Sequence, residues 1–185
     1  LLALDAEHSM TSLDLQYIYF HILIVQLHKK YLRFMVGSTH YQFGVLCFSL
    51  TSAPRVFTKV MVVVVAALLR RLGIPVFPYL NDWLLKTSFQ QMIMYHLQKT
   101  TSFVNLGFLI SLPTSDLAPS RCLLFIGAVL DTTVLRAFPP PQMVQDIRNM
   151  IQMFQMGARI PVLTILHLLG LLASCILLVT HARWH

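Results

Sequence analysis

Acidic residues are scarce in this sequence. Only seven of its 185 residues are Asp or Glu, and charged residues of all kinds make up 11%, against roughly a quarter in an ordinary soluble domain. Hydrophobic residues make up 56%, which excludes a disordered chain because such chains combine low hydrophobicity with many charges. Any mechanism built on several carboxylates must draw them from this short set: Asp5, Glu7, Asp14, Asp82, Asp116, Asp131 and Asp146.

Cysteine is also rare. Cys47, Cys122 and Cys175 lie far apart and are odd in number, which excludes a disulfide framework of the kind that holds small secreted domains together. The start of the sequence carries no series of basic, apolar and small residues typical of a signal peptide. We therefore expect an intracellular, reducing compartment, either the cytoplasm or the nucleus.

Basic residues outnumber acidic ones by fourteen to seven, which gives a formal net charge of +7. A basic surface favours a polyanion such as nucleic acid, or an anionic membrane face. The Lys and Arg residues are dispersed in ones and twos and form no basic tail. An incidental excess of charge therefore remains an alternative to nucleic-acid binding.

Two apolar runs raise the question of a membrane. Residues 60–69 are too few to cross a bilayer, whereas residues 160–180 are uncharged over a length that would fit one span. The remainder of the chain has the pattern of a mixed α/β domain with turns. We therefore expect residues 160–180 to form a buried or partner-covered helix and expect no membrane partner, with a membrane anchor kept as an alternative.

The order of predicted elements indicates an α+β fold. Thr51-Ser52-Ala53-Pro54 is typical of a helix start, and Gly73 of its end. The other predicted elements are a strand piece near residues 12–25, a hairpin of residues 31–36 and 41–48, a hairpin over 75–86 with Asn81-Asp82 at its tip, a helix over 89–106, strands at 108–112, 122–130 and 135–138, and helices over 142–156 and from 161. This order predicts an antiparallel sheet covered by helices on one face. The prolines at 139–141 predict a domain boundary, which gives domains 1–138 and 139–185.

Two of the acids fall in strand or turn settings. Asp14 alternates with apolar residues in Ser12-Leu13-Asp14-Leu15, and Asp82 follows Tyr79-Leu80-Asn81. An acid that points into an apolar sheet is costly unless it is paired or bound to a metal. Two acids on adjacent strands would favour a divalent cation such as Mg²⁺. The alternative is two strand-end aspartates that face solvent.

Five short motifs, taken in order, resemble those of retrotransposon reverse transcriptases. The chain is most similar to DIRS-like and gypsy-like elements, over roughly residues 11–140. Each motif is weak alone, but five in the right order are specific. They are Ser12-Leu13-Asp14-Leu15 with Tyr19-Phe20-His21-Ile22, Tyr31-Leu32-Arg33-Phe34 with Tyr41-Gln42-Phe43, Phe48 to Phe57, the box Tyr79-Leu80-Asn81-Asp82, and Leu106-Gly107 with Phe125-Ile126-Gly127.

This resemblance implies a right-hand polymerase palm that performs two-metal nucleotidyl transfer with Mg²⁺ or Mn²⁺. It implies partners as well, namely an RNA/DNA template–primer and a deoxynucleoside triphosphate. Asp14 and Asp82 would be metal ligands and catalytic acids. By the same resemblance, the nucleotide would lie near Tyr19, Gln42, Ala53, Pro54 and Arg55, and the primer end would be gripped by Phe125, Ile126 and Gly127. Residues 139–185 would form a helical thumb- or connection-like segment.

The sequence departs from the family pattern in the box Tyr79-Leu80-Asn81-Asp82, where the family has two adjacent acids. Asn81 stands where the family has the first of two adjacent acids, and Thr114 stands where it has a lysine. An amide supplies no negative charge for a cation. Since only residues 1–13 precede Asp14, we also expect most of the fingers to be missing. We therefore expect polymerisation to be impaired or lost, and a non-catalytic nucleic-acid-binding or interaction protein derived from the palm remains an alternative.

Overall fold

The computed structural model describes residues 6–88, 90–104, 107–154, 159–176 and 178–179. Within it the chain forms two compact units. The first contains residues 9–120, and the second joins the residues before Ser9 to those from Arg121 onward. The boundary between residues 138 and 139 divides the chain differently and stays a prediction.

A four-stranded antiparallel sheet forms the centre of the first unit. Its order is β4 (Val76–Tyr79), β5 (Asp82–Thr87), β1 (Ser9–Gln16) and β6 (Leu109–Ile110). All three pairings are antiparallel. Strand β1 is therefore central, with the β4–β5 hairpin on one side and β6 on the other.

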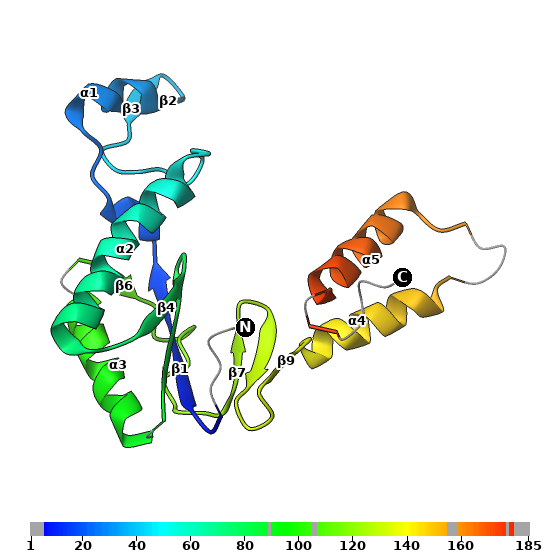
Figure 1. Cartoon of the computed structure of the whole chain (residues 1–185). Coiled ribbons are helices and arrows are strands. Elements are labelled where there is room, and N and C mark those ends of the chain that lie inside the picture. The colour runs from blue at the N-terminus through cyan, green and yellow to red at the C-terminus, as the bar shows by residue number, and fades with distance from the viewer. Residues whose placement is uncertain (1–5, 89, 105–106, 155–158, 177, 180–185) are drawn as a thin grey trace. The chain divides into compact units, whose positions relative to one another are not determined.

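Two helices cover one face of this sheet, α2 (Ala53–Leu72) and α3 (Gln90–Val104) (Figure 1). Pro54 lies in the first turn of α2, and Gly73 ends the helix in a left-handed conformation with φ of 65°, which glycine adopts without steric penalty. The helix predicted between these residues is confirmed, despite four consecutive valines. The predicted ends of the second helix, residues 89 and 105–106, lie outside the described residues.

The hydrophobic core lies between the sheet and these helices. Side chains that alternate along β1 and β5 contribute Leu13, Trp83 and Leu85, each at most 1% exposed. They pack with Phe57 of α2 and Ile93 of α3 in one cluster. Because strand side chains alternate between faces, the intervening residues of β1 and β5, Asp14 and Asp82 among them, lie on the opposite face.

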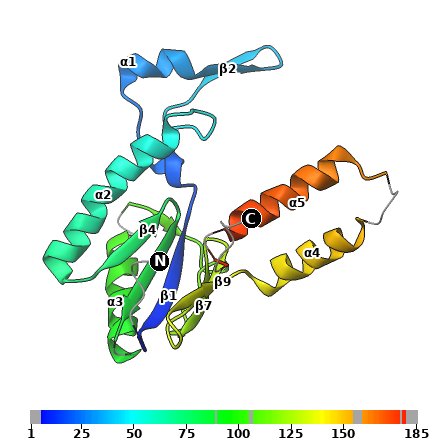
Figure 2. The same ribbon diagram turned by 45° about the vertical axis from the view of Figure 1, so that its right-hand side comes forward.

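A small hairpin lies beyond the N-terminal end of α2 in both views (Figures 1 and 2). It consists of β2 (Arg33–Val36) and β3 (Thr39–Gln42), with every residue exposed. The short helix α1 (Gln26–Lys29) precedes it, and 3-10 turns span Ile18–His21 and Lys30–Leu32. The aromatic and β-branched pattern predicts this hairpin and its first strand. The predicted second strand over residues 41–48 is wrong, because β3 is Thr39–Gln42 and its pairing with β2 ends at Gln42.

The second unit contains a three-stranded antiparallel meander: β7 (Cys122–Phe125), β8 (Ala128–Asp131) and β9 (Arg136–Phe138). The single strand predicted over residues 122–130 is wrong. Ile126 and Gly127 both have positive φ, 41° and 77°, which are the angles of a two-residue hairpin turn. A turn over residues 132–135 joins β8 to β9.

Helices α4 (Pro141–Gln152) and α5 (Val162–Cys175) pack against one another in the second unit. No helix in the described part of the chain has both the length and the apolar character needed to cross a membrane. Residues 156, 157, 177 and 180, which belong to the predicted helix end and apolar run, lie outside the described residues. The α+β fold with an antiparallel sheet and covering helices is confirmed.

Candidate functional site

Asp14 and Asp82 are directly opposite one another on neighbouring strands. The antiparallel register of β1 and β5 pairs Leu13 with Trp83 and Asp14 with Asp82. Side chains of directly opposed residues lie on the same face with Cβ atoms about 5 Å apart. The fold thus brings together two acids that are far apart in the sequence. Both side chains are half-buried.

The turn that carries Asn81 is tighter than the sequence predicts. Tyr79 pairs with Asp82, so that Asp82 is the first residue of β5 rather than the tip of the hairpin. Leu80 and Asn81 form the two-residue turn, with Leu80 at φ of 50°. The indole nitrogen of Trp83 donates to the Leu80 carbonyl over 3.2 Å, and this bond helps to hold the turn in its left-handed conformation.

Both carboxylate oxygens of Asp14 accept hydrogen bonds from neutral side chains. Nδ2 of Asn81 donates to Oδ1 of Asp14 over 2.7 Å. The Thr114 hydroxyl donates to Oδ2. Because Thr114 has a single hydroxyl proton, the Ser111 hydroxyl, 2.5 Å from it, is the donor in that second contact. A relay therefore runs from Ser111 through Thr114 to Asp14.

The backbone of the segment 111–115 holds this relay against β1. The Ser111 amide donates to the Asp14 carbonyl over 2.8 Å, and the Asp14 amide donates to Oγ of Ser115 over 2.9 Å. The Ser115 hydroxyl in turn donates to the Ser111 carbonyl over 2.6 Å. Sequence reasoning missed these contacts of Ser111, Thr114 and Ser115. The signal that could have found them is a Ser/Thr-rich segment directly after a strand that neighbours β1.

Asp82 lies in a different electrostatic environment. Burial raises the pKa of its carboxyl group above the ordinary 3.8, and the negative charge of Asp14 raises it further. Two facing carboxylates repel one another. Among the described residues no side chain donates a hydrogen bond to Asp82, whereas Asp14 receives two.

The donors at this site do not fit a pair of divalent cations. Nδ2 of Asn81 donates to Asp14, whose ionised carboxylate only accepts hydrogen bonds, so this end of the amide offers no ligand to a cation. Asp14 and Asp82 supply a formal charge of −2 against the +4 of two cations. In the part of the chain that the structure describes, no three His, Cys, Asp or Glu side chains lie together to hold a metal ion.

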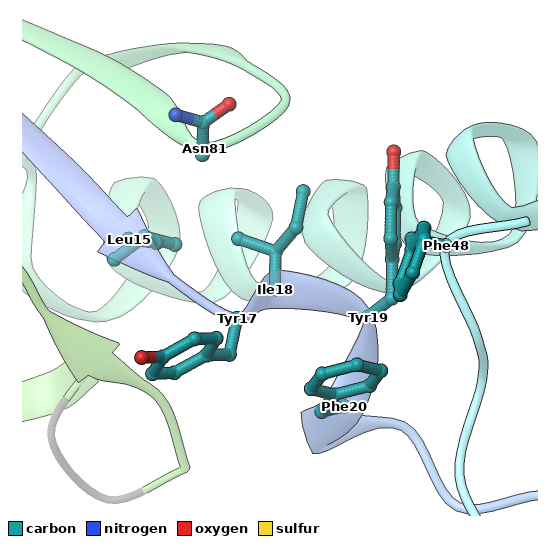
Figure 3. Close-up of a pocket in the computed structure, with 7 residues that line it drawn as sticks. All are labelled: Leu15, Tyr17, Ile18, Tyr19, Phe20, Phe48 and Asn81. Atoms are coloured by element: carbon teal, nitrogen blue, oxygen red, sulfur yellow. The ribbon is translucent and has the colours of Figure 1, made fainter. Parts of the chain in front are cut away.

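A pocket of about 300 Å³ lies beside Asn81. It is lined by Leu15, Tyr17, Ile18, Tyr19, Phe20, Phe48 and Asn81. Figure 3 shows Asn81 on the loop opposite the 3-10 turn that carries Tyr19, with Tyr17 directly before that turn. Tyr19 lines the pocket and also packs edge-on against Phe57, with ring centroids 5.8 Å apart, so it serves the core and the pocket together. The lining is mostly apolar and aromatic, and its polar side-chain groups belong to Asn81, Tyr17 and Tyr19.

The other residues predicted to lie near a nucleotide do not line this pocket. Gln42 lies on β3, where its side-chain oxygen accepts from Arg33 over 3.4 Å. Ala53 is fully buried. Pro54 and Arg55 are exposed in the first turn of α2. Their proximity to a nucleotide stays a prediction.

The three residues predicted to grip a primer form the tip of a hairpin in the second unit. Phe125 ends β7 and is 9% exposed, and Ile126 is 53% exposed. Gly127 completes the turn. An exposed turn of this kind can contact a ligand, and its role in primer binding stays a prediction.

Comparisons with known proteins show the fold and leave the family open. No family model matches the sequence, and no curated protein is similar to it. Solved structures of the foamy viral protease-reverse transcriptase are similar in fold, in complex with an RNA/DNA hybrid (TM-score 0.75, 16% identity, 90% of this chain) and, as a dRH form, with double-stranded DNA (TM-score 0.75, 16% identity, 92% of this chain). A further complex with double-stranded DNA gives a TM-score of 0.72 at 17% identity over 90% of this chain. The chain corresponds to 21%, 28% and 32% of the lengths of those chains. The fold is therefore reverse transcriptase-like.

Proposed function

We propose that this chain is a reverse transcriptase-like palm of retrotransposon origin, related to DIRS-like and gypsy-like elements, that binds nucleic acid and has lost most or all polymerase activity. The observation that carries the proposal is the register that sets Asp14 opposite Asp82. In this fold, two opposed acids beside a hairpin turn mark the place where an ancestral two-metal centre for phosphoryl transfer would lie. The ancestral ligands would be an RNA/DNA template–primer, a deoxynucleoside triphosphate and Mg²⁺ or Mn²⁺. An intracellular, reducing location is part of the same proposal.

The loss of activity follows from the charge at residue 81. An acid there would bring the local charge to −3, whereas Asn81 leaves it at −2. One charge 4 Å from a cation counts for about 4 kcal/mol at an effective dielectric constant near 20. Since each 1.36 kcal/mol is about tenfold in rate, even a fraction of this difference would lower the rate by orders of magnitude.

The distribution of charge supports a nucleic-acid partner. The first unit has nine Lys and Arg residues against three acids, a formal net charge of +6, whereas the second unit has a net charge of +1. No acidic residue lies between Asp14 and Asp82 in the sequence, while seven basic ones do: Lys29, Lys30, Arg33, Arg55, Lys59, Arg70 and Arg71. A stretch free of repulsive carboxylates is suited to contacts with phosphates. This observation favours the non-catalytic, nucleic-acid-binding form of the proposal.

A salt-dependent binding measurement tests this partner. The full chain should bind a labelled RNA/DNA primer–template, with an affinity that falls steeply as salt rises. The triple variant Lys29→Gln/Lys30→Gln/Arg33→Gln should reduce the slope of log affinity against log salt by about one for each phosphate that these side chains bind. The control is Arg136→Gln/Arg148→Gln, which removes two exposed charges from the second unit and should change the slope less than the triple variant does. A flat salt response of the unsubstituted chain would contradict the proposal.

A primer-extension assay tests the loss of polymerisation. The same chain and primer–template, supplied with deoxynucleoside triphosphates and either Mg²⁺ or Mn²⁺, should give no extension product above background. Robust extension that disappears in the Asp14→Ala variant would overturn the claim of lost activity, because it would show that the acids still work as a metal centre.

A further inference from the structure

The side chains around Asp14 form a junction between three parts of the chain that are distant in sequence. Asn81 is 67 residues from Asp14, and Thr114 is 100 residues away. The backbone adds to this junction, because the Leu15 amide donates to the Asn81 carbonyl over 2.9 Å and the Ser111 amide donates to the backbone carbonyl of Asp14 over 2.8 Å. Strand β1, the β4–β5 turn and the segment 111–115 thus meet at one carboxylate.

Asn81 and Thr114 can stabilise the Asp14 carboxylate when no cation is bound to it. Asn81 and Thr114 both present protons to Asp14, and hydrogen bonds to an ionised group are stronger than those between neutral groups. An acid at residue 81 would be acceptor-only at neutral pH. It could not donate to Asp14, and it would add a third negative charge beside Asp14 and Asp82. Such a centre would need a cation to balance it.

We propose that Asn81 and Thr114 turn Asp14 into a metal-independent structural junction, in which two neutral donors take the place that divalent cations would hold in an acidic centre. This inference deepens the proposed function and rests on it for the comparison with an acidic metal centre. Asn81 and Thr114 are positioning residues in this arrangement. They hold the β4–β5 turn and the segment 111–115 on β1 whether or not Mg²⁺ is present.

Thermal unfolding of the full chain with and without Mg²⁺ tests the junction. The melting temperature of the unsubstituted chain should be the same in EDTA and in millimolar MgCl₂. The variant Asn81→Asp should melt roughly 5 °C lower in EDTA and should recover part of that loss in MgCl₂ or MnCl₂, because cation binding to the folded state stabilises it.

The matched control is Asn149→Asp on α4. Its side-chain oxygen accepts a hydrogen bond from Gln145 over 2.9 Å, so an aspartate there keeps the bond while adding the same charge. Asn149→Asp should show neither the loss in EDTA nor the recovery with cation. A rise of several degrees for the unsubstituted chain in MgCl₂, or an Asn81→Asp variant as stable in EDTA as its parent, would overturn the proposal.

Hydrogen exchange gives a second test for the case that Asn81→Asp does not fold. Thr114→Val removes the hydroxyl at similar volume, whereas Thr114→Ser retains it. The Ser111 amide should exchange at least several-fold faster in Thr114→Val and at the parental rate in Thr114→Ser. Equal exchange in both variants would contradict the role of Thr114. A chain that binds no nucleic acid but passes these tests would refute the proposed function and leave the junction standing.

Discussion

The two faces of the β1–β5 ladder have different roles in the same strands. On the helix-covered face, Leu13 and Trp83 are opposite one another and fully enclosed in the core under α2 and α3. One residue further along, Asp14 and Asp82 are opposite one another on the other face, half-buried. Because side chains alternate along a strand, one face can maintain the fold while the other carries the polar site.

This separation explains how the fold can tolerate different residues at the polar site. The helix-covered face depends on burial of large apolar side chains, which many sequences can satisfy. The site face depends on the identity of a few polar residues, so Asn81 and Thr114 can alter it without disturbing the core. A TM-score of 0.75 at 16% identity shows a shared fold between chains in which most residues differ.

The largest expected effect is on the helix-covered face. Trp83→Ala should lower the free energy of unfolding by about 3–5 kcal/mol, because it removes a fully buried ring and leaves a cavity. Urea denaturation followed by circular dichroism measures this loss. Trp83→Phe, which keeps most of the apolar contact, should lose clearly less. If Trp83→Ala were nearly neutral, the core would not depend on this face.

The next effect concerns the site face, where the two acids should behave differently. Asp14→Ala should lower the free energy of unfolding by about 1.5–3 kcal/mol, since the Asn81 and Thr114 donors then lose a charged acceptor. Asp82→Asn should be neutral or slightly stabilising at pH 7, because it removes a carboxylate whose charged form is disfavoured by burial and by Asp14. The same denaturation experiment ranks the two variants. The reverse order would mean that Asp82, and not Asp14, holds the site together.

A smaller effect is expected where the segment 111–115 meets β1. Ser115→Ala removes the oxygen that accepts from the Asp14 amide and the proton donated to the Ser111 carbonyl. We expect a loss of about 1–2 kcal/mol, because two neutral hydrogen bonds are removed and each usually contributes about 0.5–1.5 kcal/mol. Ser102→Ala on α3, whose hydroxyl bonds only within its own helix to Gln98, is the comparison. Equal losses for the two variants would show that the contact of Ser115 with β1 stabilises the fold no more than a hydrogen bond within one helix does.

The smallest expected effect is a dependence of stability on pH that arises from His96 on α3. Burial lowers the pKa of His96 on α3 below the ordinary 6.5. The unfolded chain therefore binds a proton at a higher pH than the folded chain, so stability is full above about pH 6.5 and declines as the pH falls below it. Denaturation midpoints between pH 7.5 and 5.5 should show this decline, and His96→Phe should reduce it. The exposed His28→Gln should leave the decline unchanged, and an unaltered decline in His96→Phe would exclude His96 as its cause.

Local patterns in the sequence predicted the elements well where the chain marks its own ends. Pro54 and Gly73 delimit α2, and the aromatic pattern predicts the β2–β3 hairpin. The resemblance also predicted that Asp14 and Asp82 belong to one site, although their roles remain predictions. The pattern did not predict that the turn at Ile126 and Gly127 divides residues 122–130 into two strands, because apolar residues typical of a strand continue on both sides of it.

The contacts of Thr114 could not be predicted from local pattern. They depend on where the segment after β6 runs relative to β1, which is decided by packing across about 100 residues of sequence. The same limitation applies to the direction of the Asn81 amide. The resemblance predicts an acid at residue 81, but only the structure shows that the Asn81 amide donates to Asp14.

Anomalous diffraction from crystals of the full chain soaked in Mn²⁺ would test the central claim most directly. We expect no pair of Mn²⁺ peaks at Asp14 and Asp82, with Nδ2 of Asn81 still at hydrogen-bonding distance from Oδ1 of Asp14. Two peaks about 4 Å apart, with Asp14 as a shared ligand and the Asn81 amide turned away, would contradict it.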